Sequence, residues 1–188
     1  MTLLKIARMG HPVLTRRAEQ AADPTARDIR RLIEDMVETM DDGQGVGLAA
    51  PQVHVGRRVI IFKAPAERAD DEIEPSAASA LTALVNPVFE PLTDDMSLGW
   101  EGCLSIPGIT GAVPRYLRIR YSGVDPSGRE IEREASGFHA RVVQHEIDHL
   151  DGLIFPMRMT DLSLLSFNEE LRHFIEVERA DEDRDAAE

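Results

Sequence analysis

The sequence predicts an α+β fold in which mixed or antiparallel sheets pack around a central helix, with further helices towards the N- and C-terminal ends. Two segments, 29–40 and 137–150, carry apolar residues at spacings of three and four, which is typical of helices. Between them lie short runs rich in Val, Ile, Phe and Tyr, which predict strands. At 188 residues one domain is expected, covering residues 1–180, with a charged and disordered tail at 181–188.

The first helix is expected to begin with Asp23 as its cap and Pro24 in its first turn, because both residue types favour those positions. The sequence DDG at residues 41–43 ends the helical pattern. One face of this helix is apolar and is expected to pack on the core. That face consists of Ile29, Leu32, Ile33, Met36, Val37 and Met40.

Four segments that follow are expected to form the sheets. Residues 58–63 (RVIIFK) are a continuous apolar run, which is typical of a buried strand. Residues 83–89 and 116–121 also predict strands, and the second of these alternates cleanly. A turn at 125–128 (DPSG) leads to the polar run 129–134, which is expected to be an exposed strand.

The central helix is predicted at residues 137–150. Its spacings of four, three and four place on one face Phe138, Val142, His145 and His149. Because apolar residues share that face, the helix is expected to be buried with both histidines directed inward. Gln144 and Asp148 are the candidates, by proximity, for orienting those histidines.

Two other segments have weaker patterns. Residues 67–80 are acidic and rich in Ala and Ser, which favours an inserted surface loop. Residues 161–177 predict a C-terminal amphipathic helix, because apolar residues recur there as Leu162, Leu165, Phe167, Leu171, Phe174 and Ile175.

The sequence HEIDH within the central helix indicates a metal site. Side chains four apart on a helix lie one above the other, so His145 and His149 can bind one metal ion. Glu146 is then placed to reach a metal-bound water rather than the metal. Because two imidazoles do not complete a site, a third ligand is needed, and the only cysteine, Cys103, offers a thiolate. The pattern predicts a catalytic site with three protein ligands and one open position.

Structural roles for these residues were weighed as well. Two histidines four apart can form a half-buried polar face, and Cys103 can be a small buried hydrophobic residue. Residues 45–52 (GVGLAAPQ) allow a backbone or a substrate to approach closely, but such a run more often forms a tightly packed turn. Gln52 ends this run with an amide that can donate a hydrogen bond to an oxyanion.

Three motifs taken in order resemble the signature motifs of peptide deformylase: residues 45–52 (GVGLAAPQ), 101–105 (EGCLS) and 144–149 (QHEIDH). Residues 10–14 (GHPVL) and 113–115 (VPR) are also similar to that family, and the resemblance covers most of the chain. It implies a metal-dependent hydrolase that removes the formyl group from the N-terminal formylmethionine of newly made polypeptides and releases formate.

The resemblance also implies roles for individual residues. One divalent metal ion, Fe²⁺ in the cell with Ni²⁺, Co²⁺ or Zn²⁺ as other possibilities, is expected to bind Cys103, His145 and His149. Glu146 is expected to take a proton from the metal-bound water and deliver it to the leaving amine. Glu101 is expected either to pair with Arg115 and fix the cysteine loop or to form an ordinary surface ion pair.

The remaining implied roles concern the substrate. The oxyanion is expected to be held by the Gln52 amide and the backbone N–H of Leu104. The extended peptide is expected to pair with Gly47 and the segment after Ser105. The methionine side chain is expected in an apolar pocket, whose matching residues here are Val46, Phe138 and Val142.

Composition bounds the partners and the compartment. Thirty-four acidic residues against 21 basic ones give a net charge of -13, which argues against nucleic acid or an anionic membrane as a main partner. No apolar run approaches transmembrane length, and a single cysteine fits a reducing cytoplasm. We therefore expect a cytoplasmic protein, and a monomer, while the resemblance implies that its partners are N-formylmethionyl peptides and nascent chains.

Two other functions fit part of the pattern. A metallopeptidase of the HExxH class would use similar chemistry, but its third ligand is usually His or Glu, so Cys103 and residues 45–52 argue against it. A non-catalytic peptide-binding module that keeps a structural metal would gain little from Glu146 beside a ligand.

Overall fold

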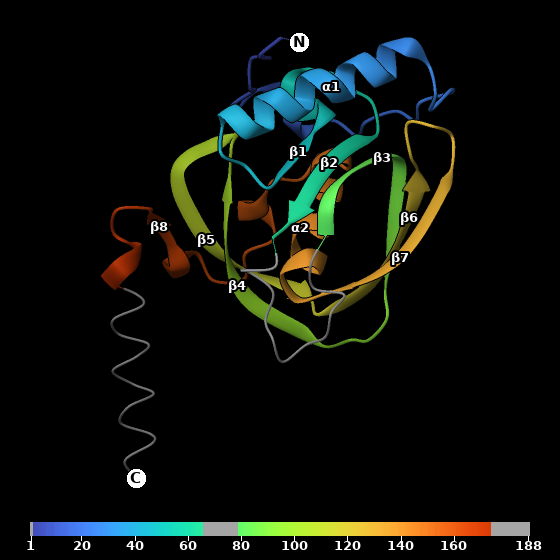
Figure 1. The fold of residues 1–188 in the computed structure, drawn as a ribbon. Helices are drawn as coiled ribbons and strands as arrows, with labels where there is room; N and C mark the ends of the chain where they lie inside the picture. Colours follow the sequence, from blue (N-terminus) through green and yellow to red (C-terminus); the bar gives the residue numbers. More distant parts are fainter. Residues whose placement is uncertain (1, 66–78, 174–188) are drawn as a thin grey trace.

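The computed structural model describes residues 2–65 and 79–173 (Figure 1). No helix among these residues is long and apolar enough to span a bilayer. The elements follow in chain order: η1 (Pro12–Thr15), α1 (Arg27–Asp42), β1 (Gly47–Ala49), η2 (Ala50–Val53), β2 (Val59–Ala64), β3 (Ser79–Pro91), β4 (Met96–Cys103), β5 (Ile106–Tyr116), β6 (Arg118–Val124), β7 (Glu130–Ser136), α2 (Gly137–Leu150), η5 (Phe155–Met157), η6 (Leu162–Leu164) and β8 (Leu165–Phe167).

The named strands form two antiparallel sheets around helix α2. One sheet has the strand order β1-β2-β3-β6-β7, and the other has the order β4-β5-β8. Helix α2 contacts β2 and β1 of the first sheet and β5 of the second, while α1 packs on β2 from outside (Figure 1). The predicted α+β class with a central helix is therefore confirmed.

Strand β2 lies at the centre of the core because both of its faces are buried. Ile60 and Phe62 share an apolar cluster with the α2 residues Val143, Ile147 and Leu150. Val59 and Ile61 point to the other side, where they join the α1 residues Ile29, Ile33, Met36 and Met40. Successive side chains of a strand alternate between faces, so a strand covered on both sides must be apolar at every position. This explains the unbroken apolar run of the sequence.

Several predicted bounds need correction. Helix α1 begins at Arg27, with Ala26 as its cap, rather than at Asp23. Asp23 instead accepts hydrogen bonds from Thr25 N and Thr25 Oγ1 in a preceding turn. The expected strand at 116–121 starts later, because Tyr116 ends β5.

The C-terminal helix expected over residues 161–177 is wrong for residues 161–170, whereas residues 171–173 are helical as expected. Residues 162–164 form η6, and residues 165–167 form β8, which pairs with Ile109, Thr110 and Gly111 of β5. Residues 174–177 lie outside the described part of the chain, as do the tail at 181–188 and most of the loop expected at 67–80.

Candidate metal centre and active site

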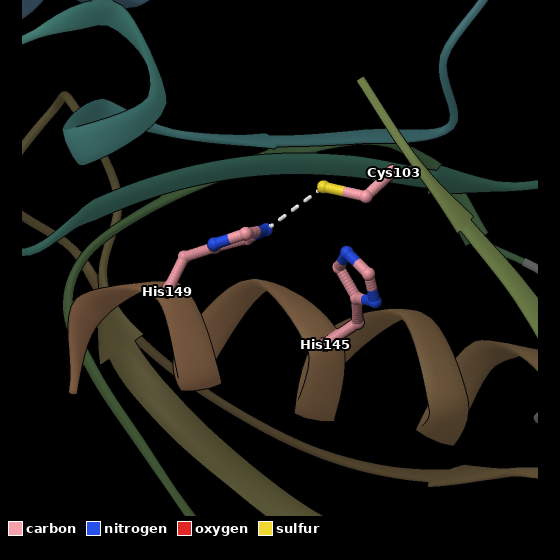
Figure 2. Close-up of side chains that lie close together, drawn as sticks. All are labelled: Cys103, His145 and His149. Carbon is pink, nitrogen blue, oxygen red and sulfur yellow. Dashed lines mark hydrogen bonds between the residues drawn. The ribbon is translucent and has the colours of Figure 1, made fainter. Parts of the chain in front are cut away.

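Three potential metal ligands converge from two elements. Helix α2 carries His145 and His149 one turn apart, with ring centroids separated by 5.0 Å. Cys103 ends β4, and its Sγ lies 3.3 Å from His149 Nε2 (Figure 2). One ligand atom from each of these three residues lies within 4.8 Å of the other two.

This cluster fits a divalent transition metal. Glu101 Oε2 lies 2.8 Å from His145 Nδ1, which leaves Nε2 of that ring for a metal. Burial alone raises the pKa of the Cys103 thiol, but the charge of His149 and hydrogen bonds from both histidines outweigh it, so the pKa lies well below its usual range. A thiolate with two imidazoles is a donor set typical of zinc and iron sites, and three donors are one fewer than a closed tetrahedral site uses.

Glu146 lies beside the cluster in a space that only glycine at position 47 leaves open. Its side chain is buried, and Oε2 has no hydrogen-bond partner among the described residues. A Cβ atom on Gly47 would overlap Glu146 Oε1. Burial, with the nearby charges of Cys103 and Glu101, raises the pKa of Glu146 to about 7 against the opposing effect of both histidines. A carboxyl group with such a pKa can both accept and donate a proton near neutral pH.

Gln52 directs its amide at the same cluster. Its Oε1 accepts a hydrogen bond from Ala49 N at 2.8 Å, which fixes the orientation of the carboxamide. Its Nε2 donates to Cys103 Sγ at 3.4 Å and to Ser105 Oγ at 3.2 Å. Gln52 and Ser105 are both buried, so the amide is held with its donors next to the sulfur.

A cavity of about 500 Å³ opens onto this cluster. All ten residues predicted for the site except His149 line it. These are Val46, Gly47, Gln52, Cys103, Leu104, Phe138, Val142, His145 and Glu146. The fold thus brings together residues that are about 100 positions apart in the sequence, and the cavity is large enough for a peptide terminus.

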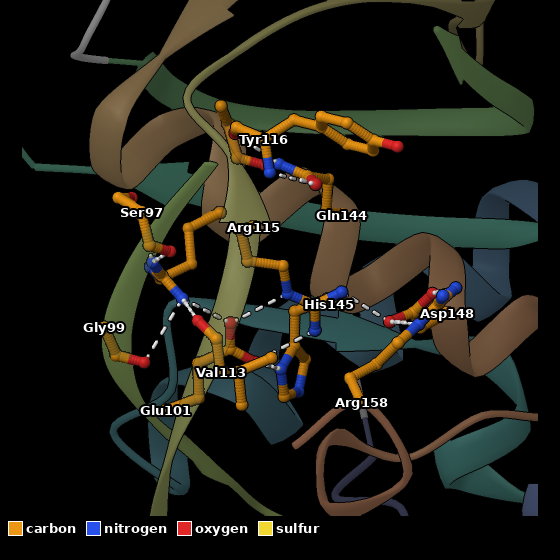
Figure 3. A network of polar contacts seen from close by, with 12 residues as sticks. Ser97, Gly99, Glu101, Val113, Arg115, Tyr116, Gln144, His145, Asp148 and Arg158 are labelled. Carbon is orange, nitrogen blue, oxygen red and sulfur yellow. Dashed lines mark hydrogen bonds and ion pairs between the residues drawn. The ribbon is translucent and has the colours of Figure 1, made fainter. Parts of the chain in front are cut away.

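The partner of His145 is Glu101 rather than Gln144 or Asp148 (Figure 3). Glu101 Oε1 accepts hydrogen bonds at 2.9 Å from Arg115 Nε and from Arg141 Nη1. The pair of Glu101 and Arg115 is almost fully buried, so it is not an ordinary surface ion pair.

The two residues suggested by proximity have other partners (Figure 3). Gln144 accepts a hydrogen bond from Tyr116 N at 3.1 Å and donates one to Tyr116 O at 2.9 Å. Asp148 forms ion pairs with Arg115 and Arg158. Sequence reasoning also missed Arg141, although its place four residues before His145 on the same helix face was a usable signal.

Comparison with known proteins shows the family to which the chain is similar. Residues 3–164 match the polypeptide deformylase family model. Peptide deformylase 1 of Bordetella pertussis is 53% identical over 166 residues, which are 88% of this chain and 93% of that protein. The structure of peptide deformylase from Ehrlichia chaffeensis in complex with actinonin is 33% identical, has a TM-score of 0.78, and covers 87% of this chain and 92% of its own. A Met-Ala-Ser-bound class I type b peptide deformylase from Acinetobacter baumannii is 33% identical with a TM-score of 0.74, covering 84% and 99%.

Proposed function

The chain belongs to the peptide deformylase family of hydrolases, which remove N-formyl groups, and from this premise we infer the role of each residue in its site. We propose that Cys103, His145 and His149 hold the catalytic metal and that Glu146 carries the proton. The observation that supports this most strongly is the convergence of the three ligand atoms at the wall of a cavity, beside a buried carboxylate of which one oxygen has no hydrogen-bond partner in the described part of the chain.

When bound, a divalent metal supplies a strong nucleophile at neutral pH by lowering the pKa of water. Two nitrogens and one sulfur suit Fe²⁺, Ni²⁺, Co²⁺ and Zn²⁺ alike. We propose Fe²⁺ as the ion in the cell, in line with the preference expected of the family.

Glu146 performs the proton transfers in this proposal. Its carboxylate accepts a proton from the attacking water, and the resulting carboxylic acid donates that proton to the amine nitrogen as the C–N bond breaks. The products are formate and a free amino terminus. The raised pKa of Glu146 supports both half-steps, because neither form is strongly favoured near pH 7.

Gln52 and Leu104 stabilise the oxyanion. The orientation of the Gln52 carboxamide is fixed by Ala49 N, so an oxyanion needs only to replace one present acceptor of its NH2 group, Cys103 Sγ or Ser105 Oγ. Leu104, whose backbone N–H is the second proposed donor, follows the cysteine and is one of the residues that line the same cavity.

The substrates are formylmethionyl peptides. We propose that they include nascent chains in the cytoplasm and that the enzyme acts on them as a monomer. Strand β1 is an edge strand of its sheet, and Gly47 lies at its start, so an extended peptide can pair there. An apolar wall suits the unbranched methionine side chain, and it is made by Val46, Phe138 and Val142.

A formate-release assay tests this function against the metallopeptidase alternative. The metal-loaded protein is expected to release one formate and one new amino terminus per formyl-Met-Ala-Ser. It is also expected to leave acetyl-Met-Ala-Ser and unmodified peptides intact. Cleavage of internal peptide bonds, or formate release that is independent of metal, would contradict the proposal.

A further inference from the structure

The three proposed ligands come from two separate elements, so some contact must hold helix α2 at a set distance from strand β4. We propose that Arg141 is this contact: a positioning residue that fixes α2 against β4 and β5 and thereby presets the cluster of Cys103, His145 and His149. The inference rests on the proposed metal site and adds a residue to which no role has been assigned.

Arg141 precedes His145 by four residues, so it lies one turn away on the same face of α2. Its side chain is 11% exposed, and its guanidinium reaches across to the backbone of the opposite hairpin. Nη1 donates to Val113 O at 2.7 Å and to Gly99 O at 3.2 Å, while Nη2 donates to Ser97 O at 2.9 Å. One side chain of the helix therefore binds both β4 and β5.

The same guanidinium also holds the carboxylate that orients a ligand. Nη1 of Arg141 lies 2.9 Å from Glu101 Oε1, and Glu101 Oε2 lies 2.8 Å from His145 Nδ1. Arg115 of β5 holds Glu101 as well and pairs with Asp148 of α2, whereas Arg141 contacts the Glu101 carboxylate from the helix itself. Glu101 of β4 is therefore held between two residues of α2, Arg141 and His145.

Gly99 supplies the space that this contact needs. A Cβ atom at position 99 would lie 2.6 Å from Arg141 Nη2 and 2.7 Å from Cζ. These distances are shorter than van der Waals contact allows, so an alanine there displaces the guanidinium without removing its charge. Lysine at 141 would keep a charge for Glu101, but a single ammonium cannot match the planar fork that bridges several carbonyls.

The test measures metal binding directly. Wild type, R141M, R141K and G99A are prepared without metal, and the dissociation constant for Co²⁺ is determined by competition with a chelator. The visible absorption spectrum of bound Co²⁺ reports the ligand geometry. R120M is the matched control, because Arg120 forms ion pairs with Glu90 and Glu134 on the surface of the other sheet.

R141M and G99A are expected to bind Co²⁺ roughly 10- to 100-fold more weakly, the usual effect of losing a partner that supports a ligand, with R141K between them and wild type. Their Co²⁺ spectra are expected to change, and kcat for formyl-Met-Ala-Ser to fall more than KM rises. R120M should match wild type in all three measurements. If R141M fails to fold, the metal affinities and spectra of G99A and R141K still test the role of Arg141.

Two results would overturn the inference and can be told apart. If wild type binds Co²⁺ tightly and R141K and G99A show the same affinity and spectrum, the positioning role of Arg141 is contradicted but the proposed metal site is not. A wild type that binds no Co²⁺ would contradict the proposed metal site and, with it, this inference.

Discussion

The site can form only because residue 47 is a glycine and has no side chain. The Glu146 carboxylate occupies the volume that a Gly47 side chain would fill. We expect G47A to displace Glu146 and lower kcat/KM for a formyl peptide by about 100-fold, since a misplacement of about 1 Å costs this much. Metal content should stay at one per chain. G56A is the control, because a Cβ there meets no atom within 4 Å.

Cys103 is the only cysteine of the chain, so its state can be followed with a thiol reagent. We expect C103S to weaken metal binding by more than about 100-fold, beyond the effect of losing a supporting partner, because a neutral hydroxyl is a poorer ligand than a thiolate. In wild type, bound metal should protect Cys103 from the reagent, and peroxide should release the metal. A C103S chain that binds stoichiometric metal as tightly as wild type would exclude Cys103 as a ligand.

Between elements, one of the contacts of α2 with the end of β5 is made by Gln144, which is buried and pairs with both backbone groups of Tyr116. Q144A leaves the partly buried N–H and C=O of Tyr116 without these partners, so we expect a loss of about 1–3 kcal/mol in the free energy of unfolding. Denaturant unfolding of the metal-free chain measures it. E132A, on an exposed strand, should change that free energy by less than about 0.5 kcal/mol. Equal effects in both variants would show that the Tyr116 contact contributes nothing specific.

Elements with a strong period were predictable from sequence, and elements that depend on distant pairing were not. Helix α2 has the predicted bounds, because its apolar and ligand residues share one face over four turns. Strand β4 was missed because Met96 and Leu98 are its exposed residues, while Glu101 is buried. In the segment of β8, apolar residues happen to be spaced like those of a helix, but pairing with β5 overrides that spacing.

The same distinction holds for the site: some of its residues were predictable from local sequence, and their distant contacts were not. The proposed ligands and Glu146 are recognisable because they stand in short motifs. The contacts that hold them come from side chains whose partners are 14 to 44 positions away, such as those of Glu101 with Arg115 and His145. No local pattern specifies which carboxylate meets which histidine, so the sequence offered Gln144 and Asp148 only as candidates by proximity, and the partner of His145 is Glu101.

At the scale of the whole molecule, the net charge of -13 disfavours binding to nucleic acid. Residues 169–188 contain nine acidic and three basic side chains, and such a segment is repelled by RNA phosphates. We expect removal of residues 181–188 to leave formyl-peptide activity and thermal stability nearly unchanged. The full-length chain should show no salt-sensitive co-sedimentation with ribosomes. Co-sedimentation at low salt that disappears with the truncation would contradict this.

The central claim, a metal held by Cys103, His145 and His149 with Glu146 as the proton carrier, is tested most directly by E146Q. Its metal content and its rate of formate release from formyl-Met-Ala-Ser should be measured on the same anaerobically purified sample. We predict one metal per chain, as in wild type, and a turnover lowered by roughly two to four orders of magnitude, the usual contribution of a general acid–base. Near-normal turnover at full metal occupancy would contradict the account.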